Sequence, residues 1–241
     1  MLRTRLVLGL LLVAGAIFLI SARCVENDAV RRGPDGNWHL YGELFNETDI
    51  QGTGMVVRGE IFDQEGNVVS AGTAPTCPRE LAPGKPVAYD VTFPNTEFQP
   101  KPATHKVTVV EGAALESPLP ELTITPTITV EELAGNKLMI GARFTKLAGL
   151  PEYGFCIAFY DGSGDMIALP VNGLILDSFN LELGIRKEIS RADIPGALDM
   201  RIWIFAVGES GSPFQPYVSF PIRLPFEKKI GATPQLPPIG S

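Results

Sequence analysis

The sequence is poor in the residues that most metal sites and nucleophilic active sites require. Its 241 residues include two histidines and three cysteines. His39 and His105 are not spaced as a His-x-x-x-His or His-Glu-x-x-His metal motif, and each falls in an alternating, strand-like segment. The sequence also has no Gly-x-Ser-x-Gly nucleophile elbow and no glycine-rich phosphate loop leading into a helix. We therefore predict half-exposed strand histidines, no catalytic residue and no cofactor.

Basic residues are also in the minority. The chain has 20 lysines and arginines against 27 aspartates and glutamates, a net charge of −7. Nucleic-acid binding depends on clustered positive charge that neutralises phosphates. An acidic chain of this kind is not expected to bind nucleic acid.

The N-terminus carries the longest uncharged apolar run in the chain. Arg3 and Arg5 precede a run from Leu6 to Ala22 that contains no charge. A basic start followed by an apolar core is typical of a secretory signal, and the length also reaches the lower limit for a membrane span. Residues 1–22 are therefore predicted to be either a cleaved signal peptide or a retained membrane anchor helix. Cys24 follows closely, but Arg23 directly before it departs from the pattern of a lipoprotein signal.

The remainder of the chain is predicted to be all-β. Short runs of valine, isoleucine, phenylalanine, tyrosine and threonine alternate with clusters of turn-forming residues, and the chain holds 25 glycines and 21 prolines. No long helical stripe appears after the apolar run. Such spacing of short strands and turns is typical of a β-sandwich.

An internal repeat of about 100 residues is the strongest pattern in the sequence. Four segments recur in order, with offsets of 99, 98, 100 and 96 residues. The pairs begin at Asn37 and Asn136, at Ile61 and Phe159, at Leu81 and Leu181, and at Lys106 and Ile202. The second pair contains Asp63-x-x-Gly66 and Asp161-x-x-Gly164, which we interpret as hairpin turns because glycine tolerates a positive φ. The repeat predicts two complete β-sandwiches, each with its own core.

The first repeat resembles a known family. Gly59-Glu-Ile61-Phe62-Asp63, followed by a glycine turn and Val68-Val69, resembles the Phe-x-Leu-Tyr-Asp strand of the bacterial FxLYD domain. Ile157-Ala-Phe159-Tyr160-Asp161 is a looser second copy, and in both copies another residue replaces the motif's phenylalanine. The resemblance implies tandem immunoglobulin-like sandwiches on an exported bacterial protein. It implies no catalytic residues.

These patterns divide the chain into five segments. We expect a signal peptide or membrane anchor, an FxLYD-like β-sandwich, a proline-rich linker, a second β-sandwich and a disordered proline-rich tail. In that order the segments are residues 1–22, 34–112, 113–126, 127–225 and 226–241.

Two groups of side chains are weak candidates for a binding site. Asp161, Ser163 and Asp165 place oxygen atoms at alternate positions, as calcium loops do, but a downstream bidentate glutamate is missing. A plain hairpin turn explains them better. Aromatic side chains could form a stacking platform for sugars, but their strand positions favour burial in a core. They are Trp38, Tyr41, Trp203, Phe205 and Tyr217.

Cys77 and Cys156 fall in the predicted exported region, where a disulfide is chemically feasible. Their positions in different repeats favour two isolated, apolar cysteines instead.

Taken together, the sequence predicts an exported, non-enzymatic cell-envelope protein whose tandem domains act as a spacer or as a binding module. The expected partner is a protein or polysaccharide of the cell envelope, with membrane contact through residues 6–22 if the segment is retained. The alternative is an exported hydrolase that uses carboxylates. A deep pocket with two converging carboxylates would favour that alternative.

Overall fold

The structure is a computed structural model, and it describes residues 23–94, 102–115, 122–145, 152–177, 182–207 and 217–224. The described residues form thirteen β-strands and one single-turn 3-10 helix, η1 (Arg191–Asp193). The strands of the first half are β1 (Arg23–Arg32), β2 (Trp38–Asn46), β3 (Gly52–Phe62), β4 (Val68–Pro75), β5 (Pro86–Phe93) and β6 (Thr104–Ala114). The strands of the second half are β7 (Thr127–Leu133), β8 (Lys137–Thr145), β9 (Glu152–Tyr160), β10 (Met166–Asp177), β11 (Glu182–Ser190), β12 (Asp199–Val207) and β13 (Tyr217–Arg223). The all-β prediction is confirmed.

Each half consists of two antiparallel sheets. In the first half the strand orders are β1-β2-β5 and β4-β3-β6, and in the second half they are β11-β8-β7 and β10-β9-β12-β13. Alternation places Leu40 and Leu44 of β2 toward Val57 and Ile61 of β3, and all four side chains are fully buried. The same alternation in the second half directs Leu138 and Ile140 of β8 into a core with Phe155 and Phe159 of β9.

The strand order of the first half recurs in the second with the strand numbers raised by six. The sheet β1-β2-β5 corresponds to β7-β8-β11, and β4-β3-β6 corresponds to β10-β9-β12, with β13 added at the edge. The two matched hairpin turns are also equivalent. In both, the glycine has a positive φ, 83° at Gly66 and 91° at Gly164, and donates its N–H to the aspartate carbonyl. The turn prediction is confirmed at both places.

Two of the four matched segments are nevertheless out of register by one residue. The offset of 99 pairs Gly42 with Gly141. Gly42 faces the first core, where an added Cβ would meet the Tyr89 hydroxyl, whereas Gly141 lies on the outward face of β8 beside exposed Arg143. The offset of 96 likewise pairs exposed Lys106 with fully buried Ile202. A shift of one residue moves a strand's side chains to the opposite face, so these two matches are wrong in register. The segment around Leu181 lies outside the described residues.

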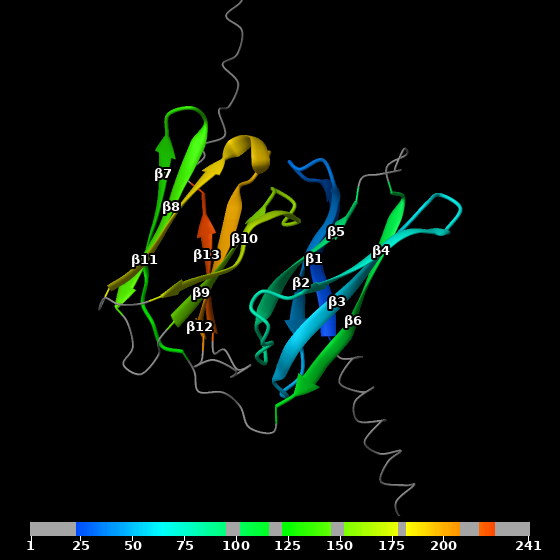
Figure 1. Cartoon of the computed structure of the whole chain (residues 1–241), viewed down its shortest axis with the longest axis horizontal. Helices are drawn as coiled ribbons and strands as arrows, with labels where there is room; N and C mark the ends of the chain where they lie inside the picture. The colour runs from blue at the N-terminus through cyan, green and yellow to red at the C-terminus, as the bar shows by residue number, and fades with distance from the viewer. Residues whose placement is uncertain are drawn as a thin grey trace, which may run out of the picture.

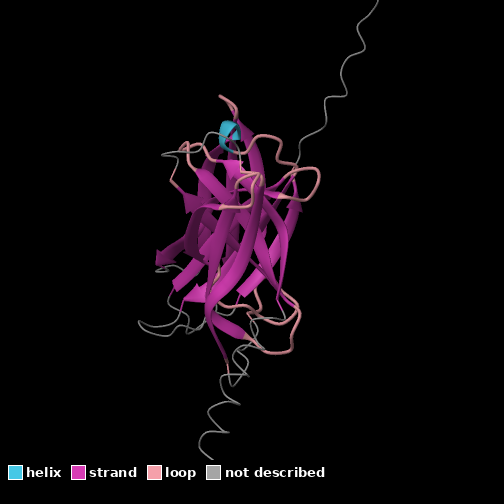
Figure 2. Cartoon of the chain, turned by 90° about the vertical axis from the view of Figure 1, so that its right-hand side faces the viewer, coloured by secondary structure: helices cyan, strands magenta, loops and turns pink. Residues whose placement is uncertain are grey.

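The four sheets lie face to face in series, as Figure 1 shows, with β11-β8-β7 at one side and β4-β3-β6 at the other. The middle contact is between β1-β2-β5 of the first half and β10-β9-β12-β13 of the second. Figure 2 shows the elongated, almost entirely stranded body, with the single helical turn at one end. The two halves are thus stacked sheet against sheet.

The expectation of two separate cores is corrected by this stacking. One apolar cluster lies wholly within the second half, but the other joins both halves. The second-half residues in the joint cluster are Cys156, Ala158, Tyr160, Met166, Leu169, Trp203, Phe205 and Tyr217. Apolar burial therefore continues from the first half into the second.

The strands also differ from the predicted segment boundaries at two points. β1 lies before the predicted start at residue 34, and it pairs with β2 from Arg23 to Arg32. β6 continues to Ala114, beyond the predicted end at 112. The predicted signal or anchor segment, residues 1–22, and the predicted tail, residues 226–241, lie outside the described residues. Within the described residues no helix is long and apolar enough to cross a membrane.

Candidate functional site

The contact between the two halves contains buried aromatic side chains, a disulfide and a buried carboxylate. Trp203 of β12 is fully buried there and donates its indole N–H to the carbonyl oxygen of Pro86, at 2.9 Å. Phe205 and Tyr217 pack in the same cluster and are almost completely buried. The prediction that Trp38, Tyr41, Trp203, Phe205 and Tyr217 are core residues rather than a sugar platform is confirmed. Trp203, Phe205 and Tyr217 of the second half pack into the cluster that also contains first-half residues.

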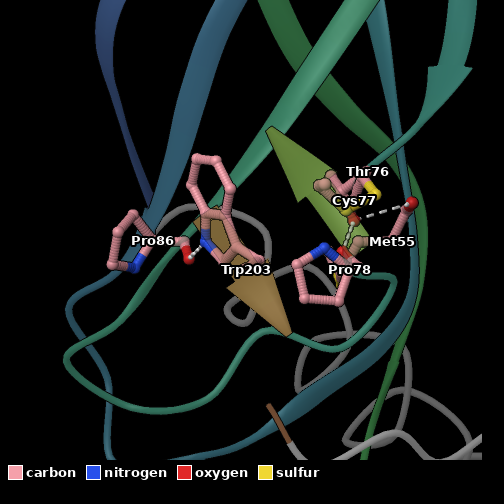
Figure 3. Close-up of a disulfide and its surroundings, with 7 residues drawn as sticks. Met55, Thr76, Cys77, Pro78, Pro86 and Trp203 are labelled. Atoms are coloured by element: carbon pink, nitrogen blue, oxygen red, sulfur yellow. Dashed lines mark hydrogen bonds between the residues drawn. A yellow bond between two sulfur atoms is a disulfide. The ribbon is translucent and has the colours of Figure 1, made fainter. Parts of the chain in front are cut away.

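A disulfide crosses this contact. Cys77 of the first half and Cys156 of β9 are bonded, with their Cα atoms 6.1 Å apart and both side chains buried. Figure 3 shows the bridge beside Trp203 and the polar contacts of Thr76, whose hydroxyl donates to the Pro78 carbonyl at 2.7 Å. The prediction of two isolated cysteines is therefore wrong. Separation between repeats argued against pairing, but the stacking of the sheets brings the two residues together.

A buried carboxylate lies at the same contact. The Glu43 side chain is only 2% exposed, and it accepts hydrogen bonds from three groups. The donors are the Asn27 amide at 2.6 Å, the Tyr160 hydroxyl at 2.8 Å and the Arg201 guanidinium. Burial, followed by the nearby charge of Glu43, raises the pKa of Tyr160 well above its usual value, so this hydroxyl stays a donor. Two of the three partners come from the second half, so the charge of Glu43 is neutralised only when the halves are joined.

Local backbone geometry positions the first of these donors. Asn27 has a φ of 53° and sits where the pairing of β1 with β2 shifts register. Such a bulge turns a side chain away from its regular direction, and asparagine tolerates a positive φ better than most residues. The bulge thereby aims the Asn27 amide at Glu43. Nothing in the sequence pattern indicated either residue.

The calcium candidates Asp161, Ser163 and Asp165 lie in a turn whose aspartates form ion pairs with Arg31 of the other half. The Asp161 carboxylate is 2.5 Å from the Arg31 guanidinium, and the Asp165 carboxylate is 3.8 Å from it. Asp161 also accepts from the N–H and the hydroxyl of Ser163. Burial alone would raise the pKa of Asp161, but the Ser163 hydrogen bonds and then the charge of Arg31 lower it. The two aspartates and Ser163 lie together in the turn, and Arg31 offsets one of the two negative charges.

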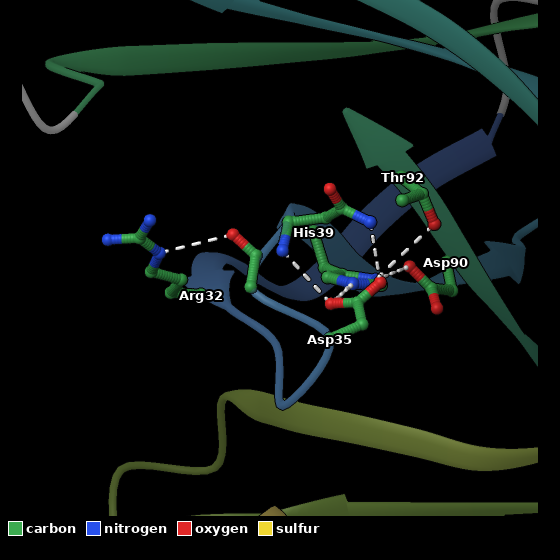
Figure 4. Close-up of polar contacts among 7 residues, drawn as sticks. Arg32, Asp35, His39, Asp90 and Thr92 are labelled. Carbon is green, nitrogen blue, oxygen red and sulfur yellow. Dashed lines mark hydrogen bonds and ion pairs between the residues drawn. The ribbon is translucent and has the colours of Figure 1, made fainter. Parts of the chain in front are cut away.

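The two histidines are both engaged with carboxylates. The ring nitrogens of His39 lie 2.8 Å from Asp90 and 3.0 Å from Asp35 (Figure 4). The His39 ring also stacks on Tyr41, with the ring centroids 5.1 Å apart. Burial would lower the pKa of His39, but the hydrogen bonds and charges of Asp90 and Asp35 raise it overall. His39 is buried, so its predicted half-exposure is wrong, whereas His105 is partly exposed as expected.

His105 bonds Asp28 at 2.8 Å. This hydrogen bond lowers the pKa of Asp28, against the opposing effect of burial.

Both ring nitrogens of His39 are already bonded to carboxylates, so His39 has no free nitrogen to act as a base. Across the described residues, no group of three or more histidine, cysteine, aspartate or glutamate side chains is placed to hold a metal ion.

Asn46 and two glutamates have structural roles. Asn46, which begins an Asn-x-Thr sequence, is fully buried, and its amide donates to the carbonyls of Ile50 and Leu81, so it stabilises a turn. The two glutamates are paired with arginines: Glu60 with Arg58 at 3.1 Å, and Glu132 with Arg191 at 2.6 Å. Surface pairs of this kind contribute little to stability.

Four surface depressions are described, with volumes of about 490, 350, 450 and 180 Å³. The first lies on the outer face of β11-β8-β7, and the second lies beside Arg201 at the contact between the halves. No more than one carboxylate is found among the described lining residues of each depression. It is Glu131 in the first, Asp199 in the second and Asp193 in the fourth, and the third has none. The paired carboxylates expected of a hydrolase do not converge in any of these four.

Comparisons with known proteins give only matches of very low similarity. The sequence matches no protein-family model and no curated protein. OgpA from Akkermansia muciniphila matches with a TM-score of 0.28 and 8% identity, over 43% of this chain and 29% of that one. The exo-chitosanase CsxA from Amycolatopsis orientalis matches with a TM-score of 0.28 and 11% identity, over 83% of this chain and 26% of that one. The chain thus spans less than a third of the length of either structure.

Proposed function

We propose that this chain is an exported, non-enzymatic protein of the cell envelope. In this proposal two tandem immunoglobulin-like domains of the FxLYD type are fastened into one rigid unit. The unit serves as a spacer or as a binding module for a protein or polysaccharide of the envelope. Residues 1–22 act as its signal peptide or membrane anchor, and the body lies outside the cytoplasm.

The observation that carries the proposal is the Cys77–Cys156 disulfide between the halves. Disulfides form and persist in oxidising compartments and are rare in the cytosol. A structural disulfide therefore fits the apolar export signal at the N-terminus, which is an independent feature of the sequence. The aromatic contact and the buried Glu43 pair add to the rigidity, since domains with a small or polar contact would move relative to each other.

The absence of paired carboxylates in the four depressions supports the non-enzymatic function over the carboxylate hydrolase. A rigid two-domain unit is suited to holding another group at a fixed distance. The same unit can present a sheet face to a partner.

Location and thiol state test this proposal together. The full chain is expressed in a bacterium that exports it, and intact spheroplasts are treated with protease. We expect the body to be digested. A matched chain that lacks residues 1–22 should stay in the cytoplasm and be protected.

In parallel, both proteins are denatured and alkylated before reduction. Cys77 and Cys156 of the exported protein should be alkylated only after reduction, whereas the truncated control should react at once. Full protease protection of the exported chain, or free thiols at both positions in it, would contradict the proposal.

A further inference from the structure

The outer face of the sheet β11-β8-β7 is left without a covering layer in the described structure (Figure 1). The equivalent sheet of the first half, β1-β2-β5, is covered by the second half. Residues on the inward face of β8, such as Ile140, are fully buried in the second core. The residues between them, such as Met139 and Arg143, therefore project outward. In the first repeat this face of the sheet packs against the other half, whereas in the second repeat the equivalent face is uncovered in the described structure.

The hydrogen-bonded register arranges the outward side chains in rows across the three strands. Thr127, Arg143 and Gly184 form one row, and Thr129, Gly141 and Arg186 form the next. The following row contains Glu131, Met139 and Glu188. A depression of about 490 Å³ lies over this part of the sheet. It is lined by Thr127, Thr129, Glu131, Met139, Gly141, Ala142, Arg143 and Arg186. Gly141 lies between Thr129 and Arg186, so a ligand can approach the backbone there.

The depression carries a local positive charge on an acidic protein. Arg143 is exposed and has no carboxylate within 4.0 Å among the described residues. Arg186 is 72% exposed and lies 3.9 Å from Glu131, a distance that leaves most of its donors available to a ligand. Two guanidinium groups and one carboxylate therefore line a hollow on a chain whose net charge is −7. Charge complementarity favours an anionic ligand.

The threonines and the methionine that line the depression indicate which class of anion could bind there. Arginine binds a carboxylate through two parallel hydrogen bonds, and the threonine hydroxyls can exchange hydrogen bonds with sugar hydroxyls. Met139 adds an apolar surface that can pack against the carbon atoms of a sugar ring. We propose that this depression binds the uronic acid residues of an acidic polysaccharide. This proposal deepens the binding-module function proposed above, although binding in solution does not depend on where the protein is located.

The test is a calorimetric titration of the full chain at low ionic strength with an oligogalacturonate. The same oligomer with its carboxylates methyl-esterified is the neutral control. We expect binding of the acidic oligomer and little or none of the ester. The variant Arg143→Thr/Arg186→Thr should weaken binding at least tenfold, because both guanidinium groups are lost while strand-compatible side chains are kept.

Two further variants distinguish binding at this depression from non-specific charge attraction to the protein surface. Gly141→Thr fills the floor of the hollow without changing the charge, and it should also weaken binding severalfold. Arg58→Thr removes an exposed strand arginine that pairs with Glu60 on the opposite outer sheet, and it should bind normally. Thermal unfolding monitored by circular dichroism confirms that each variant is folded.

Several results would overturn the proposal. One is no binding by the parent chain, and another is an equal loss in Arg58→Thr. A third is binding of inorganic polyphosphate as tightly as oligogalacturonate with no effect of Gly141→Thr, which would indicate charge attraction alone. None of these results bears on the protease and thiol experiment, so failure here leaves the proposed location and the disulfide as they stand.

Discussion

The disulfide between the halves should contribute a large part of the chain's stability. Cys77 and Cys156 are separated by 79 residues, so the bond closes a long loop in the unfolded chain. The chain-entropy relation for a loop of this length gives about 4.5 kcal/mol at 25 °C. For a protein of this size, each kcal/mol corresponds to about 2–4 °C in Tm. We therefore expect reduction to lower the Tm by about 9–18 °C.

The measurement is thermal and urea unfolding of the full chain with and without a reductant. Reduction keeps both sulfur atoms in place, so it isolates the cross-link from any loss of packing. Cys24→Ala retains the bridge and serves as the matched control, with the same response to reductant as the parent chain. Cys77→Ala/Cys156→Ala should unfold early and should not respond to reductant at all.

The reasoning would be refuted if the reduced and oxidised chains unfolded at the same temperature. It would also be refuted if the double variant were as stable as Cys24→Ala. Either result would mean that the two halves are held equally well without the bond. A loss near 4.5 kcal/mol together with a larger urea m-value on reduction would support a cross-link that acts mainly on the unfolded state, because the reduced unfolded chain is less compact.

The remaining predictions address the contact between the halves and the titrating groups. Residues 23–115 and residues 122–224, produced separately, should aggregate or unfold without cooperativity and should improve when mixed, because each exposes one apolar side of the shared contact. Two soluble, cooperative fragments, as two sandwiches with separate cores would give, would contradict this. Arg201→Leu should destabilise the chain by about 2–3 kcal/mol in urea unfolding, since it leaves the carboxylate of Glu43 buried without its cation. Glu43→Leu/Arg201→Leu should recover most of that loss, because neither charge is then buried alone. Equal losses in the single and the double variant would refute the pairing of Glu43 with Arg201. The folded-state pKa of His39 is raised, so protonated His39 should stabilise the fold fully below about pH 6.5, and this stabilisation should disappear as the pH rises through the folded-state pKa. The stability difference between the parent chain and His39→Gln, measured from pH 5 to 9, should therefore shrink as the pH rises. A difference that stays constant over this range would argue against the role of His39. Added calcium or a chelator should leave the Tm unchanged, because the aspartate turn between β9 and β10 already pairs with an arginine, and a shift of several degrees would restore the calcium hypothesis.

Local pattern was sufficient for the parts of the fold that depend on neighbouring residues. Period-two alternation predicted the strands and the burial of the aromatic residues, because each strand places successive side chains on opposite faces. The Asp63 and Asp161 turns were predicted correctly because a glycine with positive φ three residues after an aspartate is a local requirement. The same local logic failed when segments were aligned by identity alone. Gly42 and Gly141 share a residue type but face opposite sides of their sheets.

The sequence by itself determined the all-β class of the fold and the two aspartate turns, since these follow from periodicity and backbone preference. Only the tertiary structure decided how the halves meet. The covering of β1-β2-β5 by β10-β9-β12-β13 brings Cys77 to Cys156, Glu43 to Arg201 and Arg31 to Asp161, over separations of 79, 158 and 130 residues. No pattern within a strand encodes such contacts, because they depend on which outer face of one sheet packs against which face of another. The free outer face of β11-β8-β7, with its two arginines, is a consequence of that same choice.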